Sequence, residues 1–314
     1  MKLKDVVEYL NLLESFSMSA ECNDAVRVLD SVRHVVTNHG LQWASETQTL
    51  NQDFDNITNG MSDFQRTLDN LKQQLRDEIA RQEGEYFRES LRLFNHDMIH
   101  ETNDYILDRR LGIDSDSNIL LRSHLRSLGD WRLPGLIFRP GRETFIEDMV
   151  PMDPLYLVDQ HLDLLKPSVE KFAPEYQRRL RQYVVNDRSH ERFLAQLPQN
   201  QFGLVFAYNF FNFKPIEIIR QYITEIYDIV RPGGTLLMTY NNCDQGQGVG
   251  LVERGFMCYT PKRYIRSHAE SVGFDLSFEH DGAGDLSWLE FVKPGHITSL
   301  RGGQTLAKIF AKTD

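Results

Sequence analysis

The stretch that decides the fold is FGLVFAYN at 202–209, followed by IVRPGGTLLMTY at 229–240. Each contains a short apolar run of the length and composition of a buried strand. The residues between them, 214–230, carry apolar side chains at helical spacing. The Pro-Gly-Gly at 232–234 indicates a turn between that helix and the next strand. This segment therefore predicts a strand, a helix and a second strand.

The same pattern continues outward on both sides of this segment. Five further short apolar runs occur, and helical stretches are expected over 160–180 and 261–272; the runs are 136–138, 155–158, 183–185, 274–278 and 288–292. Alternating strands and helices predict an α/β fold with a doubly wound, mostly parallel seven-stranded sheet over 135–314. Ligands of such sheets bind beyond the carboxyl ends of the strands, so functional residues are expected there.

Acidic residues follow two of these strands. LYLVD at 155–159 ends in Asp159, which is suited to holding a ribose diol, and the next strand is followed by Asp187. With the strand at 202–209 and the Pro-Gly-Gly turn, this order resembles the class I S-adenosylmethionine (SAM)-dependent methyltransferases over roughly residues 130–314. The resemblance implies SAM as cofactor, held at the ribose by Asp159 and at the adenine by Asp187. It also implies that Tyr208 and Asn209 lie near the methyl acceptor.

The loop after the first strand departs from the family pattern of acid-x-Gly-x-Gly-x-Gly. Aligned on 137–143, the acid is Ile137, the first glycine is Arg139 and the third is Glu143, so that only Gly141 is kept. The resemblance implies that Arg139, Gly141 and Glu143 shape the cofactor site. Glu143 would repel the carboxylate of the cofactor, whereas Arg139 can pair with it.

Three other features of this half each allow two interpretations. The aromatic side chains of Phe210, Phe211 and Phe213 either form a cage or stacking surface near the acceptor or anchor the following helix. His161 either begins a helix or acts as a base. The loop at 241–250, with three glycines among polar residues, is either a mobile lid or substrate loop or a surface excursion.

The N-terminal part is expected to be helical, with helices at 3–15 and 20–37. From residue 50 two apolar rows recur every seven residues and interleave as a heptad seam; one is Leu50, Ile57, Phe64 and Leu71, the other Phe54, Met61, Leu68 and Leu75. The seam predicts one continuous helix from about 46 to 93. Either this helix packs on residues 1–40 of its own chain, or it forms a coiled coil that makes the protein a homo-oligomer through residues 46–93.

These patterns divide the chain into four predicted segments. They are N-terminal helices at 1–44, a long helix or coiled coil at 45–95, a helical connector at 96–134 and the methyltransferase-like domain at 135–314. All eleven prolines follow residue 130, which separates the helical part from the α/β part.

Composition limits the partners of the protein. Thirty-five basic and 45 acidic side chains give a net charge of −10, which argues against nucleic-acid binding. No apolar run approaches the roughly 18 residues that cross a bilayer, and no signal peptide is recognised at the start, so no membrane association is expected. Three cysteines are too few for a disulfide framework, and a cytoplasmic location is expected.

No metal site is predicted. The segment 114–118 resembles the start of a calcium loop, but Ile119 replaces its glycine and Leu125 its glutamate, so a helix cap is the better interpretation. His96 and His100 are four residues apart without the rest of a zinc-protease motif.

Two functions remain open at this point. The first is a SAM-dependent methyltransferase acting on a small-molecule or protein acceptor. The second is a non-catalytic scaffold, for example of a viral particle or another large assembly, that keeps the fold and oligomerises through its N-terminal helix. Whether the chain is an enzyme depends on the site, because fold alone does not determine function.

Overall fold

The computed structural model describes residues 2–15, 27, 44–95, 116–140, 145–189, 191–255, 257–282 and 287–295. The chain forms two units, residues 1–84 and 85–314, which are considered separately below. The predicted helix at 20–37 and most of the predicted connector at 96–134 lie outside the described residues. The four-segment division proposed from the sequence stays a prediction.

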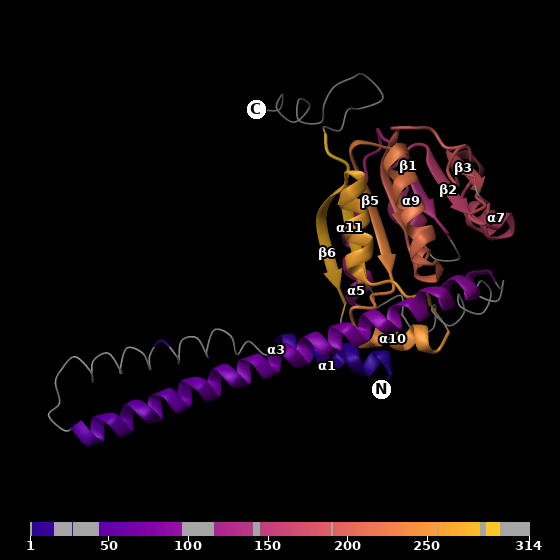
Figure 1. The fold of residues 1–314 in the computed structure, drawn as a ribbon. Helices are drawn as coiled ribbons and strands as arrows, with labels where there is room; N and C mark the ends of the chain where they lie inside the picture. The colour runs from indigo at the N-terminus through magenta and orange to yellow at the C-terminus, as the bar shows by residue number, and fades with distance from the viewer. Residues whose placement is uncertain are drawn as a thin grey trace, which may run out of the picture. The chain divides into compact units, whose positions relative to one another are not determined.

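The second unit is built on a seven-stranded sheet with the order β3-β2-β1-β4-β5-β7-β6 (Figure 1). All strand pairs are parallel except those of β7, which runs antiparallel to β5 and β6. The strands are β1 Gly135–Phe138, β2 Leu155–Asp159, β3 Leu180–Val184, β4 Phe202–Ala207, β5 Val230–Tyr240, β6 Asp275–Asp281 and β7 Ser287–Val292. The predicted doubly wound, mostly parallel sheet is confirmed.

Helices cover both faces of this sheet. The helices are α5 Asp116–Leu128, α6 Phe145–Met149, α7 Leu162–Glu170, α8 Pro174–Gln177, α9 Ile216–Ile229, α10 Gly246–Glu253 and α11 Lys262–Val272, with a 3₁₀ turn η1 at Phe211–Phe213. Side chains of α9 and α11 pack with Phe138 and Met238 in one core, and those of α5, α6 and α7 pack with Ile137 and Leu237 in the other. Neighbouring residues of one strand thus enter opposite cores, as the strand period of two requires.

The predicted helix at 160–180 is wrong in its second half. Helix α7 ends at Glu170, α8 is a single turn from Pro174 to Gln177, and β3 begins at Leu180, earlier than expected. The break lies at Ala173, whose backbone is extended (ψ 147°) because the residue before a proline is pushed out of the helical region.

The Arg231-Pro232-Gly233-Gly234 segment lies inside β5 rather than in a separate turn before it. Gly233 has φ 77°, and its N–H donates to the Lys293 carbonyl over 2.7 Å, while the Gly234 carbonyl accepts the Lys293 N–H over 2.9 Å. A Cβ at Gly234 would lie 2.7 Å from the Phe202 carbonyl oxygen, so only glycine fits there. The glycine pair lies where the register between β4 and β5 shifts, as at a β-bulge, and it allows the two strands to pair on both sides of that shift.

The predicted loop at 241–250 is neither an open lid nor a surface excursion. Asn241, Asn242 and Cys243 are buried, and α10 begins at Gly246. A Cβ at Gly248 would lie 2.1 Å from the Asn242 carbonyl oxygen. The glycines therefore let a helix pack directly on the backbone that leaves β5.

The first unit contains α1, Leu3–Ser15, and most of α3, Ala44–Asn95. The heptad segment is one uninterrupted helix, so the continuous helix predicted for 46–93 is confirmed. Arg76 of α3 pairs with Glu14 of α1 over 2.7 Å, so the two helices contact within one chain. The coiled coil between chains stays a prediction. Among the helices that the structure describes, none is long and apolar enough to cross a membrane.

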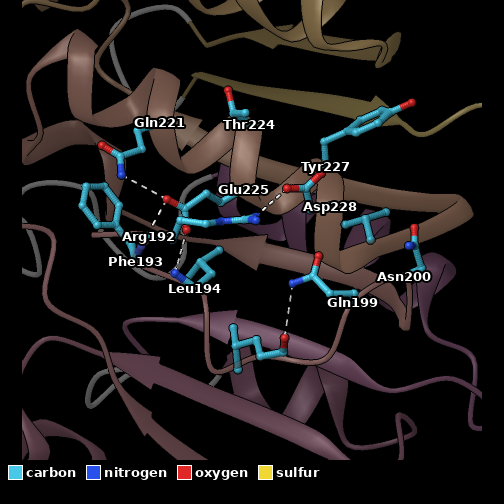
Figure 2. Close-up of polar contacts among 12 residues, drawn as sticks. Arg192, Phe193, Leu194, Gln199, Asn200, Gln221, Thr224, Glu225, Tyr227 and Asp228 are labelled. Atoms are coloured by element: carbon cyan, nitrogen blue, oxygen red, sulfur yellow. Dashed lines mark hydrogen bonds and ion pairs between the residues drawn. The ribbon is translucent and has the colours of Figure 1, made fainter. Parts of the chain in front are cut away.

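The buried carboxylate of Glu225 on α9 binds the backbone of the segment between β3 and β4. The backbone N–H groups of Phe193 and Leu194 donate to its two oxygens over 3.1 and 2.7 Å (Figure 2). Gln221 of the same helix donates to Glu225 over 3.0 Å. Since Glu225 is buried, these donors satisfy a charge that would otherwise be costly to bury.

We expect Glu225→Gln to lower the free energy of unfolding by about 2 kcal/mol, because an amide N–H group then faces a backbone N–H group. Urea denaturation measures the change. Glu217→Gln, on an exposed turn of the same helix, is the matched control and should change stability by less than about 1 kcal/mol. Equal effects of the two substitutions would show that Glu225 does not fasten this segment.

Candidate functional site

The carboxyl ends of β1, β2 and β4 meet at one edge of the sheet. Phe138 of β1 pairs in register with Val158 of β2 and with Ala207 of β4. The residues that follow these strands, among them Arg139, Asp159 and Asn209, therefore lie at the same edge. Strand β1 lies between β2 and β4, and the sheet continues along the chain first on the β2 side and then on the β4 side. Ligands of such sheets bind at this point, where the strand order switches direction.

Arg139 follows β1 at the position of the first family glycine. Its φ of 49° is left-handed, so the backbone keeps a glycine-like conformation although the residue carries a long side chain. Its N–H donates to the Val158 carbonyl over 2.7 Å, and its Nη1 donates to the Asn209 carbonyl over 3.1 Å. The guanidinium lies 5.0 Å from the centre of the Phe213 ring.

Burial lowers the pKa of Arg139 to about 10, and the neighbouring Asp159 opposes that shift. The guanidinium thus remains a cation at neutral pH in a region with little water. A buried cation at this edge can hold an anionic ligand group, and the resemblance assigns the carboxylate of the cofactor to this end of the site.

Asn209 repeats the backbone conformation of Arg139. It also has φ 49°, a region in which asparagine is better tolerated than most residues. Its N–H donates to Thr239 Oγ1 of β5 over 2.7 Å, which fixes the turn after β4. Its side-chain Oδ1 is buried and has no hydrogen-bond partner among the described residues.

Asp159 ends β2 with one of its carboxylate oxygens already bound. Oδ1 accepts the N–H of His161 over 3.0 Å at the start of α7. His161 is the residue before the first turn of this helix, in agreement with the first of its two interpretations. Oδ2 is buried and has no partner within the described part of the chain, and neither has Oε1 of Gln160. Burial raises the pKa of Asp159, although the His161 N–H and Arg139 lower it. An acceptor oxygen at this place can take a ligand hydroxyl.

Asp187 lies beyond β3 and is buried among donors from the chain itself. Lys214 Nζ and the Tyr222 hydroxyl donate to its Oδ2, the latter over 3.2 Å, and Gln160 Nε2 donates to its Oδ1. Burial raises the pKa of Tyr222 well above its usual range, and Asp187 raises it further. The carboxylate that the resemblance assigns to the adenine is therefore occupied.

Lys214 is the cation at the centre of this arrangement. Its Nζ lies 4.4 Å from the ring centre of Phe210, 5.4 Å from that of Phe94 and 5.8 Å from that of Tyr222. Burial lowers the pKa of Lys214, while Asp187 raises it. Three aromatic rings and one carboxylate thus enclose the Lys214 ammonium.

The aromatic segment after β4 packs in the core. Phe210, Phe211 and Phe213 are buried, and the rings of Phe210 and Phe211 meet Tyr222 of α9 at 5.2 and 5.7 Å. The interpretation that these residues anchor the following helix is confirmed. The Phe210 ring faces the Lys214 ammonium, and the Phe213 ring faces the Arg139 guanidinium.

Tyr208 and Asn209, the acceptor candidates, lie in different surroundings. The Tyr208 ring is 4.4 Å from that of Phe145 on α6, and its hydroxyl donates to Asn118 Oδ1 on α5 over 3.3 Å. Asn209 instead contacts Arg139 and Thr239. A hydrogen bond therefore joins Asn209 to the charged group of Arg139 at the end of β1.

The last turns of α3 belong to this unit and contact residues near the same edge. Ser90 Oγ accepts the N–H of Tyr259 over 3.0 Å, and the Phe87 ring meets Tyr259 edge-on at 5.3 Å. Phe94 covers Lys214, as described above, and the Arg188 guanidinium lies 5.9 Å from the same ring. The C-terminal end of α3 thus supplies part of the enclosure of Lys214.

Sequence reasoning missed Lys214, Gln160 and Tyr222. The one available signal was a lysine between Phe213 and Pro215 in an otherwise apolar and aromatic run. Gly141 and Glu143, both predicted to shape the cofactor site, lie outside the described residues, as do His96 and His100. Among the residues that the structure describes, no group of acidic, histidine and cysteine side chains is arranged to hold a metal ion.

Solved structures share the fold of this chain. One is from a complex between the Trm112 methyltransferase activator of Haloferax volcanii and a candidate methyltransferase, with TM-score 0.50, 11% identity, and coverage of 63% of this chain and 99% of that one. Another is the N-methyltransferase NodS of Bradyrhizobium japonicum with S-adenosylhomocysteine, with TM-score 0.45, 14% identity, and coverage of 62% and 100%.

A third is a SAM-dependent methyltransferase of Mesorhizobium loti, with TM-score 0.45, 11% identity, and coverage of 58% and 100%. No family profile matches the sequence, and no curated protein matches it either. The chain therefore has the class I methyltransferase fold.

The described residues fit SAM at one end of the site and not at the other. Asp159 Oδ2 could accept a hydroxyl such as that of a ribose, and the Arg139 guanidinium could pair with a carboxylate. Asp187 can meet an adenine amino group only if Lys214 gives up its place.

A double-mutant cycle measures how strongly Lys214 and Asp187 depend on each other. Lys214→Met should lower the free energy of unfolding by about 3–5 kcal/mol, because it leaves Asp187 charged and buried. Adding Asp187→Asn should recover part of that loss, which gives a coupling of about 1–3 kcal/mol in urea denaturation.

The exposed pair Arg192–Asp228 provides the control for this cycle. Its own cycle, with Arg192→Met and Asp228→Asn, should give less than about 1 kcal/mol, since solvent screens the pair. Additive effects of Lys214→Met and Asp187→Asn would contradict the ion pair described here.

Proposed function

We propose that this protein binds SAM at the carboxyl ends of β1, β2 and β4 and transfers its methyl group to a small molecule or a protein side chain. The observation that carries the proposal is the buried Asp159 Oδ2, which has no hydrogen-bond partner among the described residues and lies where a ribose hydroxyl is expected. A buried acceptor without a donor is costly to the folded chain, and a ligand hydroxyl would remove that cost.

Bound SAM would supply a methyl group already activated by its sulfonium centre. The chain then has to bind and orient the reactants, which can supply most of the rate, and it needs a base only where the acceptor must lose a proton. Arg139 would hold the cofactor carboxylate and Asp159 the ribose. Asn209, whose buried Oδ1 lacks a donor in the described part of the chain, is the better placed of the two acceptor-side candidates.

The reaction is proposed to take place in a reducing, cytoplasmic compartment. Cys243 and Cys258 are buried thiols that form no disulfide with each other, and Cys22 lies outside the described residues. Burial raises the pKa of Cys258 to about 12, so its thiol is not a nucleophile at neutral pH.

A specific observation on α3 favours a second function, that of an oligomeric scaffold. Ile57, Phe64 and Leu71 form one row of the heptad seam, and they are 50%, 51% and 42% exposed. The side chains of the other row are less exposed, since Met61 and Leu68 are half-buried and Leu75 is buried. Burying an exposed apolar row of this kind favours association, and a heptad row suits another helix. We therefore propose that a second copy of the chain covers this row.

Asp159→Asn tests the methyltransferase proposal. The amide Oδ1 can still accept the His161 N–H, so the start of α7 is kept while the acceptor Oδ2 is lost. Calorimetric titration with SAM and S-adenosylhomocysteine should show affinity weakened at least about tenfold, the value of a hydrogen bond to a charged group. Asp163→Asn, on an exposed position of α7, should bind like the unaltered protein.

Two results would count against this proposal. Equal affinities of the Asp159→Asn variant and the unaltered protein would mean that the ribose does not lie at β2. Absence of binding both to the unaltered protein and to the Lys214→Met variant would remove the cofactor and leave the scaffold as the better proposal.

Ile57→Lys with Leu71→Lys tests the scaffold proposal. Light scattering coupled to size exclusion should show an oligomer for the unaltered full-length protein and a monomer for the variant, because paired helices would bury like charges. Asn59→Lys with Gln73→Lys adds the same charge at the same spacing on exposed positions outside the seam, and should leave the oligomer intact. A monomeric unaltered protein would refute self-association through α3.

A further inference from the structure

Asp187 is expected to accept the amino group of adenine, yet its carboxylate already accepts hydrogen bonds from Lys214, Tyr222 and Gln160. Gln160 and Tyr222 donate through neutral groups, so Lys214 is the charged one of these three donors. Its ammonium is fully enclosed, with Phe210, Phe94 and Tyr222 around it. The adenine-facing carboxylate is therefore matched to a cation of the chain itself.

We propose that Lys214 occupies the base end of the cofactor site: its ammonium stands in for the amino group of a purine at Asp187, and a purine nucleoside binds only when Lys214 leaves. This inference rests on the proposed function, because it concerns how the same site admits SAM. It makes Lys214 a residue that controls affinity for the nucleoside without taking part in methyl transfer.

The position of Lys214 in the chain suits such a displacement. It lies between the end of η1 and Pro215, with an extended backbone (φ −115°, ψ 140°), so its side chain can turn without breaking a helical hydrogen bond. Burial already disfavours its charge and lowers its pKa. A purine amino group would replace the donor at Asp187, and the ammonium would regain water.

A second buried lysine is the internal control. Lys293 Nζ donates to Asn200 Oδ1 and to the carbonyls of Tyr227 and Val230 over 2.7–2.9 Å. These partners lie at the C-terminal end of α9, and none belongs to the residues around Asp159 and Asp187. Lys293 should therefore not respond to a ligand at the cofactor site.

Acetylation of the unaltered full-length protein, read by peptide mass spectrometry, follows both lysines. Without ligand, both should be protected relative to the exposed Lys166. At saturating SAM or S-adenosylhomocysteine, acetylation of Lys214 should rise several-fold while that of Lys293 stays low. If calorimetry shows that SAM binds and Lys214 stays protected, the displacement is overturned but the proposed cofactor stands.

Lys214→Met gives the complementary measurement. With the ammonium removed, SAM should bind at least about tenfold more tightly than to the unaltered protein, because binding no longer has to displace it. If this variant does not fold, Lys214→Gln, which keeps an N–H donor for Asp187, is used and should also gain affinity.

The two measurements separate the two proposals. Binding by a Lys214 variant but not by the unaltered protein would support the displacement and assign SAM to the site. Binding by neither would overturn both the displacement and the proposed cofactor. Equal affinity for the unaltered protein and the variant would overturn the displacement alone.

Discussion

The ion pair between Lys214 and Asp187 joins most of the parts that make up the site. Asp187 follows β3, Gln160 follows β2, Lys214 lies between η1 and α9, Tyr222 lies on α9, and Phe94 lies in the last turn of α3. A buried pair of this kind contributes little net stability, because desolvation offsets attraction, but removing one partner is costly. The pair thus fixes an arrangement more than it stabilises the fold, and any ligand at Asp187 has to compete with it.

The strands were predictable because a strand that is buried on both faces of the sheet forms a continuous apolar run in the sequence. A run such as Leu204–Phe206 must be apolar throughout, since neighbouring side chains enter opposite cores. The errors arose where one local signal opposed another. The apolar spacing across 160–180 favoured a helix, but Pro174 ends it, and the glycines of 241–250 suggested a loop where they permit close packing of α10.

The site was predictable only in part, for a physical reason. Asp159 and Asp187 follow strands, so their place was implied by the fold. Lys214 is 27 residues from Asp187, and the residues around it in the sequence do not indicate that the two side chains form an ion pair. Asp159 Oδ2 has no hydrogen-bond donor among the described residues. Whether a buried oxygen has a donor depends on all of its neighbours in space, so it cannot be predicted from the spacing of residues in the sequence.

At Arg139 the departure from the glycine pattern concerns the side chain and not the backbone. A left-handed backbone at a non-glycine residue costs about 1–2 kcal/mol, yet φ is 49° at Arg139. Arg139 therefore adopts this conformation at a cost in stability. The strained backbone and the enclosed guanidinium of this one residue support the proposal that an anionic group binds at this edge of the sheet.

The long helix does not oppose that interpretation. The exposed row of α3 lies in the first unit, whereas every residue assigned to the cofactor site lies in the second. Association through residues 57–71 and ligand binding at Asp159 therefore use separate side chains, and neither requires the other to fail. The two functions inferred from the sequence as alternatives can belong to one protein: an oligomer whose α/β units each hold a nucleoside ligand. The end of α3 links them covalently, since the helix that carries the exposed row also supplies Phe94 to the enclosure of Lys214.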